Sequence, residues 1–162
     1  MKTKIRLALF ASGSGSNAEN IIRHFLHHPL IEVYAVLCNK PGAYVLERTA
    51  PYGVDQRVFT REDLYENDQI YSYLDWFEID YIILAGFSWL MPARIIEAFP
   101  ERIINIHPAL LPKYGGKGMY GMRVHEAVVA AGEKETGITV HLVNEKYDEG
   151  QTLFQARVAL EV

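Results

Sequence analysis

Cysteine is nearly absent from this chain of 162 residues, which contains Cys38 alone. A single cysteine excludes an internal disulfide and suits a reducing compartment, so we expect a cytoplasmic protein in which Cys38 packs in the core. Positive charge is not in excess either, because 16 Lys and Arg stand against 20 Asp and Glu. The net charge of -4, without a basic cluster, argues against a nucleic-acid partner.

Long apolar runs are also missing from the sequence. No stretch approaches the roughly 20 residues that a membrane-spanning helix needs, so we expect no membrane partner. The basic N-terminus is followed by apolar residues 7–11, but this run is too short for a signal peptide and glycines follow it at once.

What is present is the composition of an ordinary globular domain, with 49% hydrophobic and 22% charged residues. The length suits one domain with a sizeable core, and we expect a single domain over residues 1–162. Hydrophobic patterning predicts strands at residues 5–11, 31–38, 57–59, 79–85, 102–107, 137–143 and 151–158. It predicts helices at residues 18–28, 43–50, 62–77, 92–99 and 124–131.

The alternation of strands and helices up to residue 107 predicts an α/β fold with a doubly wound, mostly parallel sheet. No helix separates the last two strands, so we expect them to form an antiparallel pair. In such folds ligands bind beyond the carboxyl ends of the strands, where the strand order reverses. The loops after Ala11, Ala85 and Ile106 should therefore lie on one rim.

The segment at residues 102–113 carries the most informative polar residues. Asn105 and His107 are two residues apart at the end of an apolar strand that Pro108 stops, so their side chains should share a face. An amide donor beside an imidazole suits acyl transfer, because the amide can hold an oxyanion while the imidazole moves protons. A strand-end asparagine beside a core histidine explains the same two residues equally well.

The glycine-rich loop at residues 12–17 follows the first strand and opens a helix. Backbone N–H groups at such a glycine-rich helix start would make an anion site suited to a phosphate monoester, and Ser16 and Asn17 would add side-chain donors. The alternative is a tight turn in which Ser16 and Asn17 cap the helix. The loop has neither the third glycine of a dinucleotide fingerprint nor the lysine of a P-loop.

Asp148 and the remaining histidines each allow a functional and a structural interpretation. Asp148 could orient His107, or it could be an ordinary turn aspartate that bonds its own backbone. His24 and His28 have a zinc-like spacing without a third ligand, and a solvated helix face is the simpler reading. His141 shares a face with Thr139 and is expected to be a packed core histidine.

Five motifs occur in an order that covers nearly the whole chain. They lie at residues 12–17, 84–87, 105–113, 137–141 and 148–150. Together they resemble the phosphoribosylglycinamide formyltransferases, a family of folate-dependent enzymes of purine biosynthesis. The stretch Asn-x-His-Pro-x-Leu-Leu-Pro at residues 105–112 is specific to folate formyltransferases and their hydrolase relatives. The resemblance implies a Rossmann-like formyltransferase fold.

The resemblance also implies a reaction, in which the amino group of glycinamide ribonucleotide takes the formyl group of 10-formyltetrahydrofolate, a cosubstrate. Asn105 and His107 would stabilise the tetrahedral oxyanion, and Asp148 would organise His107 and a water that transfers the proton. The other implied roles are a support for this network (Thr139), a phosphate site (Gly15, Ser16, Asn17) and a pterin pocket (Trp89, Leu90, Asn144, Glu145, Lys146, Tyr147). The partners are glycinamide ribonucleotide and folate, no metal is needed, and the chain is expected to be a monomer or a homodimer.

The sequence departs from the family pattern in two places. Many relatives have Gly-Phe-Met-Arg-Ile-Leu where this chain has Gly-Phe-Ser-Trp-Leu-Met at residues 86–91. The chain ends after its last expected strand, so we expect that it lacks the family's C-terminal helix. A formyltetrahydrofolate hydrolase and a non-catalytic folate-binding module are the alternatives, and the glycines at residues 115–121 mark a candidate lid.

Overall fold

The computed structural model describes residues 2–161. Its seven strands are β1 (Ile5–Ala11), β2 (Ile31–Cys38), β3 (Asp55–Val58), β4 (Tyr81–Leu84), β5 (Ile103–His107), β6 (Glu135–Leu142) and β7 (Thr152–Ala159). Its helices are α1 (Ser16–Phe25), α2 (Tyr44–Thr49), the 3-10 turn η1 (Ala50–Tyr52), α3 (Arg61–Tyr65), α4 (Gln69–Trp76), α5 (Ala93–Ala98) and α6 (Met122–Ala130).

All seven strands form one sheet in the order β3-β2-β1-β4-β5-β6-β7. The chain winds outward from β1 to β3, then returns to place β4 on the other side of β1, so the order reverses between β1 and β4. Strands β1 to β5 are parallel, whereas β6 runs antiparallel to β5 and β7 antiparallel to β6. The predicted fold class, with its antiparallel pair at the C-terminal end, is confirmed.

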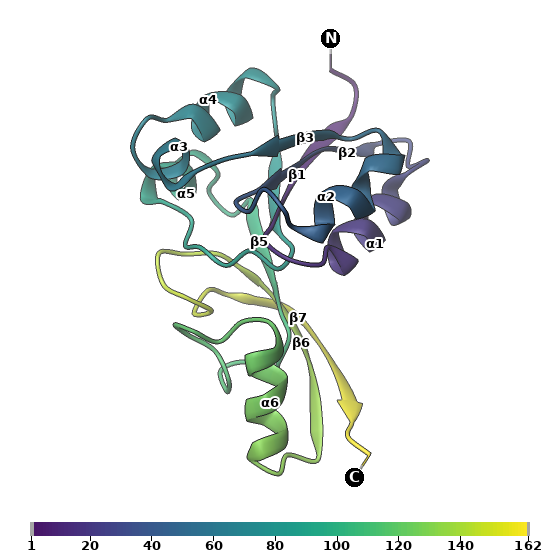
Figure 1. The fold of residues 1–162 in the computed structure, drawn as a ribbon, viewed down its shortest axis with the longest axis vertical. Helices are drawn as coiled ribbons and strands as arrows, with labels where there is room; N and C mark the ends of the chain where they lie inside the picture. Colours follow the sequence, from purple (N-terminus) through teal and green to yellow (C-terminus); the bar gives the residue numbers. More distant parts are fainter. Residues whose placement is uncertain (1, 162) are drawn as a thin grey trace.

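Helices cover both faces of the parallel part of the sheet (Figure 1), which explains its continuous apolar strands. Alternation along β1 sends Ala8 and Phe10 to the cluster beneath α4 and α5, and Leu9 and Ala11 to the cluster beneath α1 and α2. Cys38 is fully buried in the second cluster, as expected. Burial raises the pKa of its thiol.

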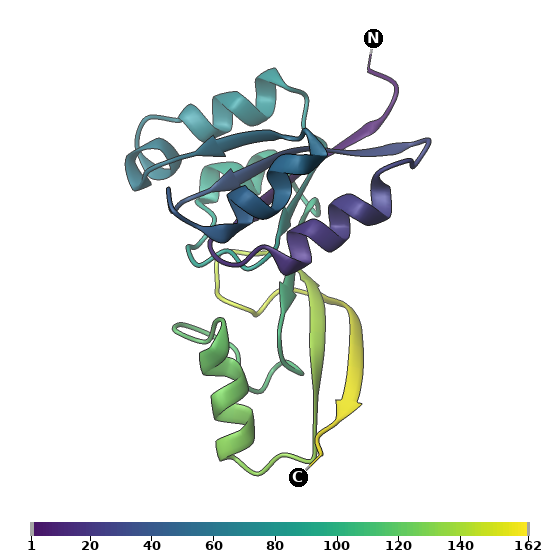
Figure 2. The same ribbon diagram turned by 45° about the vertical axis from the view of Figure 1, so that its right-hand side comes forward.

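The antiparallel part of the sheet extends away from this body. Figures 1 and 2 show β6 and β7 running away from the covered strands, with α6 alongside them. β7 is the edge strand, and most of its residues are exposed. Strand β5 belongs to both parts, since it pairs with β4 on one side and β6 on the other, and it carries its polar end to their junction.

The single helix expected at residues 62–77 is wrong, because the chain forms two helices there, α3 and α4. Asp68 separates them with a left-handed backbone (φ 58°), a conformation that aspartate tolerates better than most residues. Asn67 accepts a hydrogen bond from the Gln69 N–H, which starts the second helix. A capping box of Thr60 and Asp63 begins the first.

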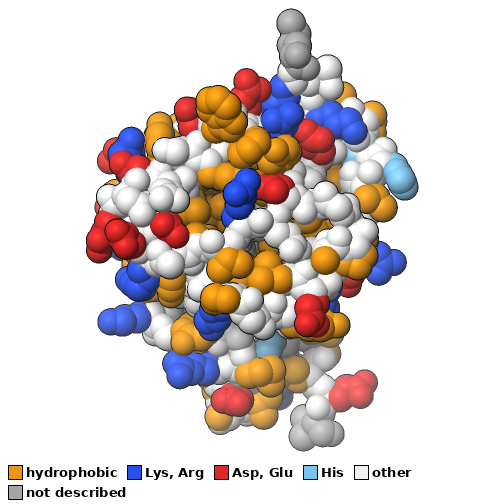
Figure 3. Space-filling model, turned by 45° about the horizontal axis from the view of Figure 1, so that its top comes forward, with side chains coloured by type: hydrophobic (Ala, Val, Ile, Leu, Met, Phe, Trp, Pro, Cys, Tyr) orange, Lys and Arg blue, Asp and Glu red, His pale blue; other side chains and the backbone are white. Residues whose placement is uncertain are grey.

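The surface of the molecule is mixed in character. On the face shown in Figure 3, acidic and basic side chains are interspersed among apolar ones. Within residues 2–161, no helix has both the length and the apolar character needed to cross a membrane.

Candidate active site

A pocket of about 580 Å³ lies beyond the carboxyl ends of β1, β4 and β5, where the strand order reverses. The three predicted rim loops all line it, and so does the segment around Asp148. Ten of the predicted site residues are among its lining: Gly15, Ser16, Asn17, Trp89, Leu90, Asn105, His107, Lys146, Tyr147 and Asp148. Residues far apart in the sequence therefore converge on one cavity.

The glycine-rich loop places the start of α1 at this pocket. Gly15 has φ 78°, and a Cβ atom there would lie 2.5 Å from Cγ2 of Val45, so both conformation and space require glycine. Ser16 and Asn17 line the pocket, and in the described part of the chain no side chain caps the helix. The capping alternative is therefore wrong, and uncapped N–H groups, with Lys40 also on the lining, suit an anion.

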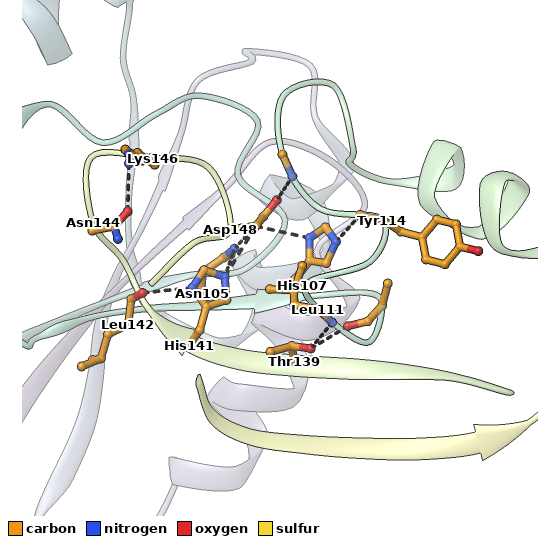
Figure 4. A network of polar contacts seen from close by, with 12 residues as sticks. Asn105, His107, Leu111, Tyr114, Thr139, His141, Leu142, Asn144, Lys146 and Asp148 are labelled. Atoms are coloured by element: carbon orange, nitrogen blue, oxygen red, sulfur yellow. Dashed lines mark hydrogen bonds and ion pairs between the residues drawn. The ribbon is translucent and has the colours of Figure 1, made fainter. Parts of the chain in front are cut away.

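Asn105 and His107 point to the same side of β5, as the alternation predicts, and both reach Asp148 (Figure 4). Asn105 Nδ2 lies 3.3 Å from Asp148 Oδ1, and His107 Nδ1 lies 3.4 Å from the same oxygen. The other ring nitrogen of His107, Nε2, lies 2.7 Å from the carbonyl oxygen of Tyr114. A carbonyl only accepts, so Nε2 carries a proton and donates to it.

Asp148 is a turn residue, but among the described residues its side chain bonds Asn105 and Gly116 and not its own backbone. It lies in a turn with a left-handed backbone (φ 54°), and its side chain also contacts His107. Burial acts to raise the pKa of Asp148, but hydrogen bonding by His141, the charge of His107 and the Gly116 N–H at 3.1 Å outweigh it and lower that pKa. The carboxylate is therefore held ionised inside the pocket.

His141 belongs to this network, although its sequence context predicted only a core histidine. Its Nδ1 lies 3.0 Å from the Leu142 carbonyl and donates to it, and its Nε2 lies 3.1 Å from the Asn105 amide nitrogen and 3.5 Å from Asp148 Oδ1. The ring is 2% exposed and lines the pocket. The available signal was its spacing from Thr139, but its partner could not be known without the register of β5 and β6.

Thr139 lies outside the lining of the pocket and bonds the segment that follows His107. Its hydroxyl is fully buried, donates to the Ala109 carbonyl at 2.7 Å and accepts from the Leu111 N–H at 3.0 Å. Gln155 donates to the same hydroxyl at 3.0 Å. These bonds fix the turn that follows His107.

An aromatic and apolar wall completes the pocket. Trp89 and Leu90 line it, and the Tyr65 hydroxyl holds the Leu90 carbonyl at 2.6 Å. Of the segment predicted to complete this wall, Lys146 and Tyr147 line the pocket, whereas Asn144 and Glu145 are exposed outside it. The structure therefore brings only half of that segment to the cavity.

Several lining residues had no role predicted from the sequence. They include Lys40, Met119, Tyr120, and Met122 and His125 in the first turn of α6, whereas Gly118, which also lines the pocket, belongs to the candidate lid. Their contribution depends on how the loop at residues 115–121 folds over the pocket. No sequence pattern predicts that conformation. Across residues 2–161, no group of three or more His, Cys, Asp or Glu side chains is arranged to hold a metal ion.

Comparison with known proteins gives a consistent set of relatives. The sequence profile of the family described as "Formyl transferase" matches residues 5–161. The chain is 38% identical over 159 residues to the chloroplastic phosphoribosylglycinamide formyltransferase of Arabidopsis thaliana, covering 94% of this chain and 54% of that protein. It is 36% identical over 161 residues to the phosphoribosylglycinamide formyltransferase of Haemophilus influenzae, covering 96% of this chain and 73% of that protein.

The solved structures agree with the sequence relatives. The crystal structure of phosphoribosylglycinamide formyltransferase from Brucella melitensis matches with a TM-score of 0.84 and 38% identity, over 97% of this chain and 81% of that one. The chain spans about half the length of the plant relatives it matches.

Proposed function

The chain belongs to the formyl transferase family, and on this basis we propose that it transfers a formyl group from 10-formyltetrahydrofolate to the amino group of glycinamide ribonucleotide. The observation that carries the proposal is the position of two features on one pocket. These are the uncapped start of α1 behind the glycine-rich loop, and the hydrogen-bonded group of Asn105, His107 and Asp148. The first suits the phosphate of a ribonucleotide and the second suits acyl transfer.

In the proposed reaction the amino nitrogen attacks the formyl carbon and forms a C–N bond. The carbonyl electrons move to oxygen and give a tetrahedral oxyanion. When it collapses, the bond to N10 of the folate breaks and the proton lost by the amine ends on N10. The protein must therefore hold a transient negative oxygen and move one proton.

The chain's own groups suit both tasks. Asn105 and His107 would supply N–H donors for the oxyanion. The formyl oxygen would replace one of the groups that these donors now contact, such as the Asp148 carboxylate or the Tyr114 carbonyl. Asp148, 3.4 Å from His107 Nδ1, would orient that ring, and it would organise a water that takes the proton from the amine and passes it to N10. The wall of Trp89, Leu90 and Tyr147 suits a flat pterin ring.

The test is release of the deformylated folate, followed by absorbance, with and without glycinamide ribonucleotide. Release that requires the ribonucleotide supports the transferase. Equal release in both samples would instead identify a formyltetrahydrofolate hydrolase. Folate binding without release in either sample would identify a binding module, and it would contradict the proposed reaction.

A further inference from the structure

The turn at residues 114–116 contacts both members of the charged pair in the pocket. The Tyr114 carbonyl accepts from His107 Nε2 at 2.7 Å, and the Gly116 N–H donates to Asp148 Oδ2 at 3.1 Å (Figure 4). Since His107 and Asp148 also face each other at 3.4 Å, the conformation of this one turn fixes the relative position of the two groups.

The conformation of the turn is not favourable by itself. Tyr114 has φ 59°, in the left-handed region that tyrosine rarely adopts. Gly115 then passes so close to its neighbours that a Cβ atom there would lie 2.6 Å from Leu111 Cδ2 and 3.2 Å from Asp148 Cβ. A turn of this kind depends on contacts made from outside it.

The outside contacts converge on Glu133. The Tyr114 hydroxyl donates to Glu133 Oε1 at 2.8 Å, and Lys113 Nζ donates to the same oxygen at 3.2 Å. Glu133 follows Gly132, which ends α6 with φ 69°, and its N–H bonds back to the Val128 carbonyl of that helix. The carboxylate is therefore anchored to α6, and it lies outside the lining of the main pocket.

We propose that Glu133 is a positioning residue for the reaction: through Tyr114 and Lys113 it holds the turn that orients His107 and Asp148. The inference rests on the proposed function, since it assumes that these two groups serve formyl transfer. The hydrogen bond from Tyr114, and to a smaller extent the one from Lys113, lowers the pKa of Glu133. The hydrogen bond between Tyr114 and Glu133 also raises the pKa of Tyr114. The anchor is thus an anion facing two donors.

The test compares Glu133→Ala and Tyr114→Phe with Glu133→Gln, which keeps an acceptor for the tyrosine hydroxyl. Glu135→Ala is the matched control, because Glu135 lies on the same surface and pairs with Arg157 at 2.8 Å instead. We expect kcat to fall about tenfold in the first two variants, with KM for both substrates within about twofold. The pH profile of kcat should shift with them, while Glu133→Gln and Glu135→Ala stay close to the parent protein.

A second readout needs no substrate. The Nε2 nitrogen of His107, observed by NMR, should shift in Glu133→Ala and Tyr114→Phe and not in Glu135→Ala. If Glu133→Ala fails to fold, Tyr114→Phe decides, because it removes one hydroxyl and keeps the ring. An unchanged Nε2 signal and an unchanged kcat, or an equal loss in Glu135→Ala, would overturn the proposal. A parent protein that transfers no formyl group would refute the proposed function, while the NMR result would still decide whether Glu133 positions His107.

Discussion

Asn105 and His141 face each other across the antiparallel strands β5 and β6, with 3.1 Å between Asn105 Nδ2 and His141 Nε2. The Leu142 carbonyl accepts from His141 Nδ1, and the Asp148 carboxylate, which lies 3.5 Å from His141 Nε2, can only accept from the Asn105 amide. The amide is thereby fixed with its nitrogen toward Asp148, and its second N–H reaches that carboxylate at 3.3 Å. The contacts with His141 and Asp148 thus set the orientation of the predicted oxyanion donor.

The first prediction concerns His107. In His107→Ala we expect the rate of formyl transfer to fall by about 10²–10⁴, the usual range for loss of a positioned proton donor or acceptor. Folate binding should remain close to that of the parent protein, because the apolar wall of Trp89 and Leu90 is untouched. Single-turnover rates and isothermal titration with folate measure the two effects.

A matched control for this prediction is His27→Ala, since His27 is an exposed histidine in the turn between α1 and Pro29 and is not among the residues that line the pocket. It should leave both the rate and folate binding unchanged. A His107→Ala protein that transfers at the parent rate would show that this imidazole takes no part in the reaction.

The second prediction concerns Gly15. In Gly15→Ala the new Cβ atom would lie 2.5 Å from Cγ2 and 2.7 Å from the backbone Cα of Val45, in a residue that has φ 78°. The left-handed backbone alone costs about 1–2 kcal/mol, so we expect a lower unfolding midpoint. The KM for glycinamide ribonucleotide should rise, because α1 must move away from the pocket, whereas KM for folate should change little.

Gly13→Ala is the control, since among the described residues nothing lies within 4 Å of a Cβ atom at that position in the same loop. Its unfolding midpoint should stay close to that of the parent protein. If Gly15→Ala and Gly13→Ala behaved alike, the close approach of the loop to Val45 would not matter for substrate binding.

Much of the fold could be predicted from the sequence because its signals are local. Apolar strands buried on both faces, such as residues 5–11 and 31–38, have the bounds expected from hydrophobic patterning. The shared face of Asn105 and His107 follows from alternation alone. The break between α3 and α4 was missed because residues 62–77 keep an amphipathic pattern through it, and the left-handed Asp68 has no periodic signal.

The parts of the site that could not be predicted are tertiary contacts. The contact of Asp148 with His107 joins residues that are 41 positions apart in the sequence. It depends on how the turn that contains Asp148 packs against the end of β5. The pairing of Asn105 with His141 depends on the register of β5 and β6. The role proposed for Glu133 depends on where α6 ends relative to Tyr114. That position is set by tertiary packing and leaves no periodic signal in the sequence.

The third prediction follows from the lowered pKa of Asp148. A carboxyl whose pKa is lower in the folded than in the unfolded chain stabilises the fold above its ordinary value of 3.8, and this stabilisation is lost as the pH falls through the folded value. Asp148→Asn removes the titrating group. We therefore expect the difference in urea midpoint between parent and variant to be largest near about pH 6 and to shrink below about pH 4. A difference that stayed constant or grew on acidification would contradict the assignment of the lowered pKa to Asp148.

The last prediction compares two threonines on β6. The Thr139 hydroxyl has three partners and is fully buried, whereas the Thr136 hydroxyl is buried with no partner among residues 2–161. Valine has nearly the same shape as threonine, so each Thr→Val change tests the hydroxyl alone. Thr139→Val leaves the Leu111 N–H and the Ala109 carbonyl unsatisfied and should cost about 2 kcal/mol or more of unfolding free energy.

Thr136→Val removes a buried polar atom that bonds to nothing in the described chain, so it should be neutral or stabilising. The two variants should also differ in activity, because only Thr139 holds the turn after His107 and its loss should lower kcat. Urea unfolding and initial rates on both proteins make the comparison. Equal stability of the two variants would mean that the turn is held by Pro108 and its packing rather than by the Thr139 hydroxyl.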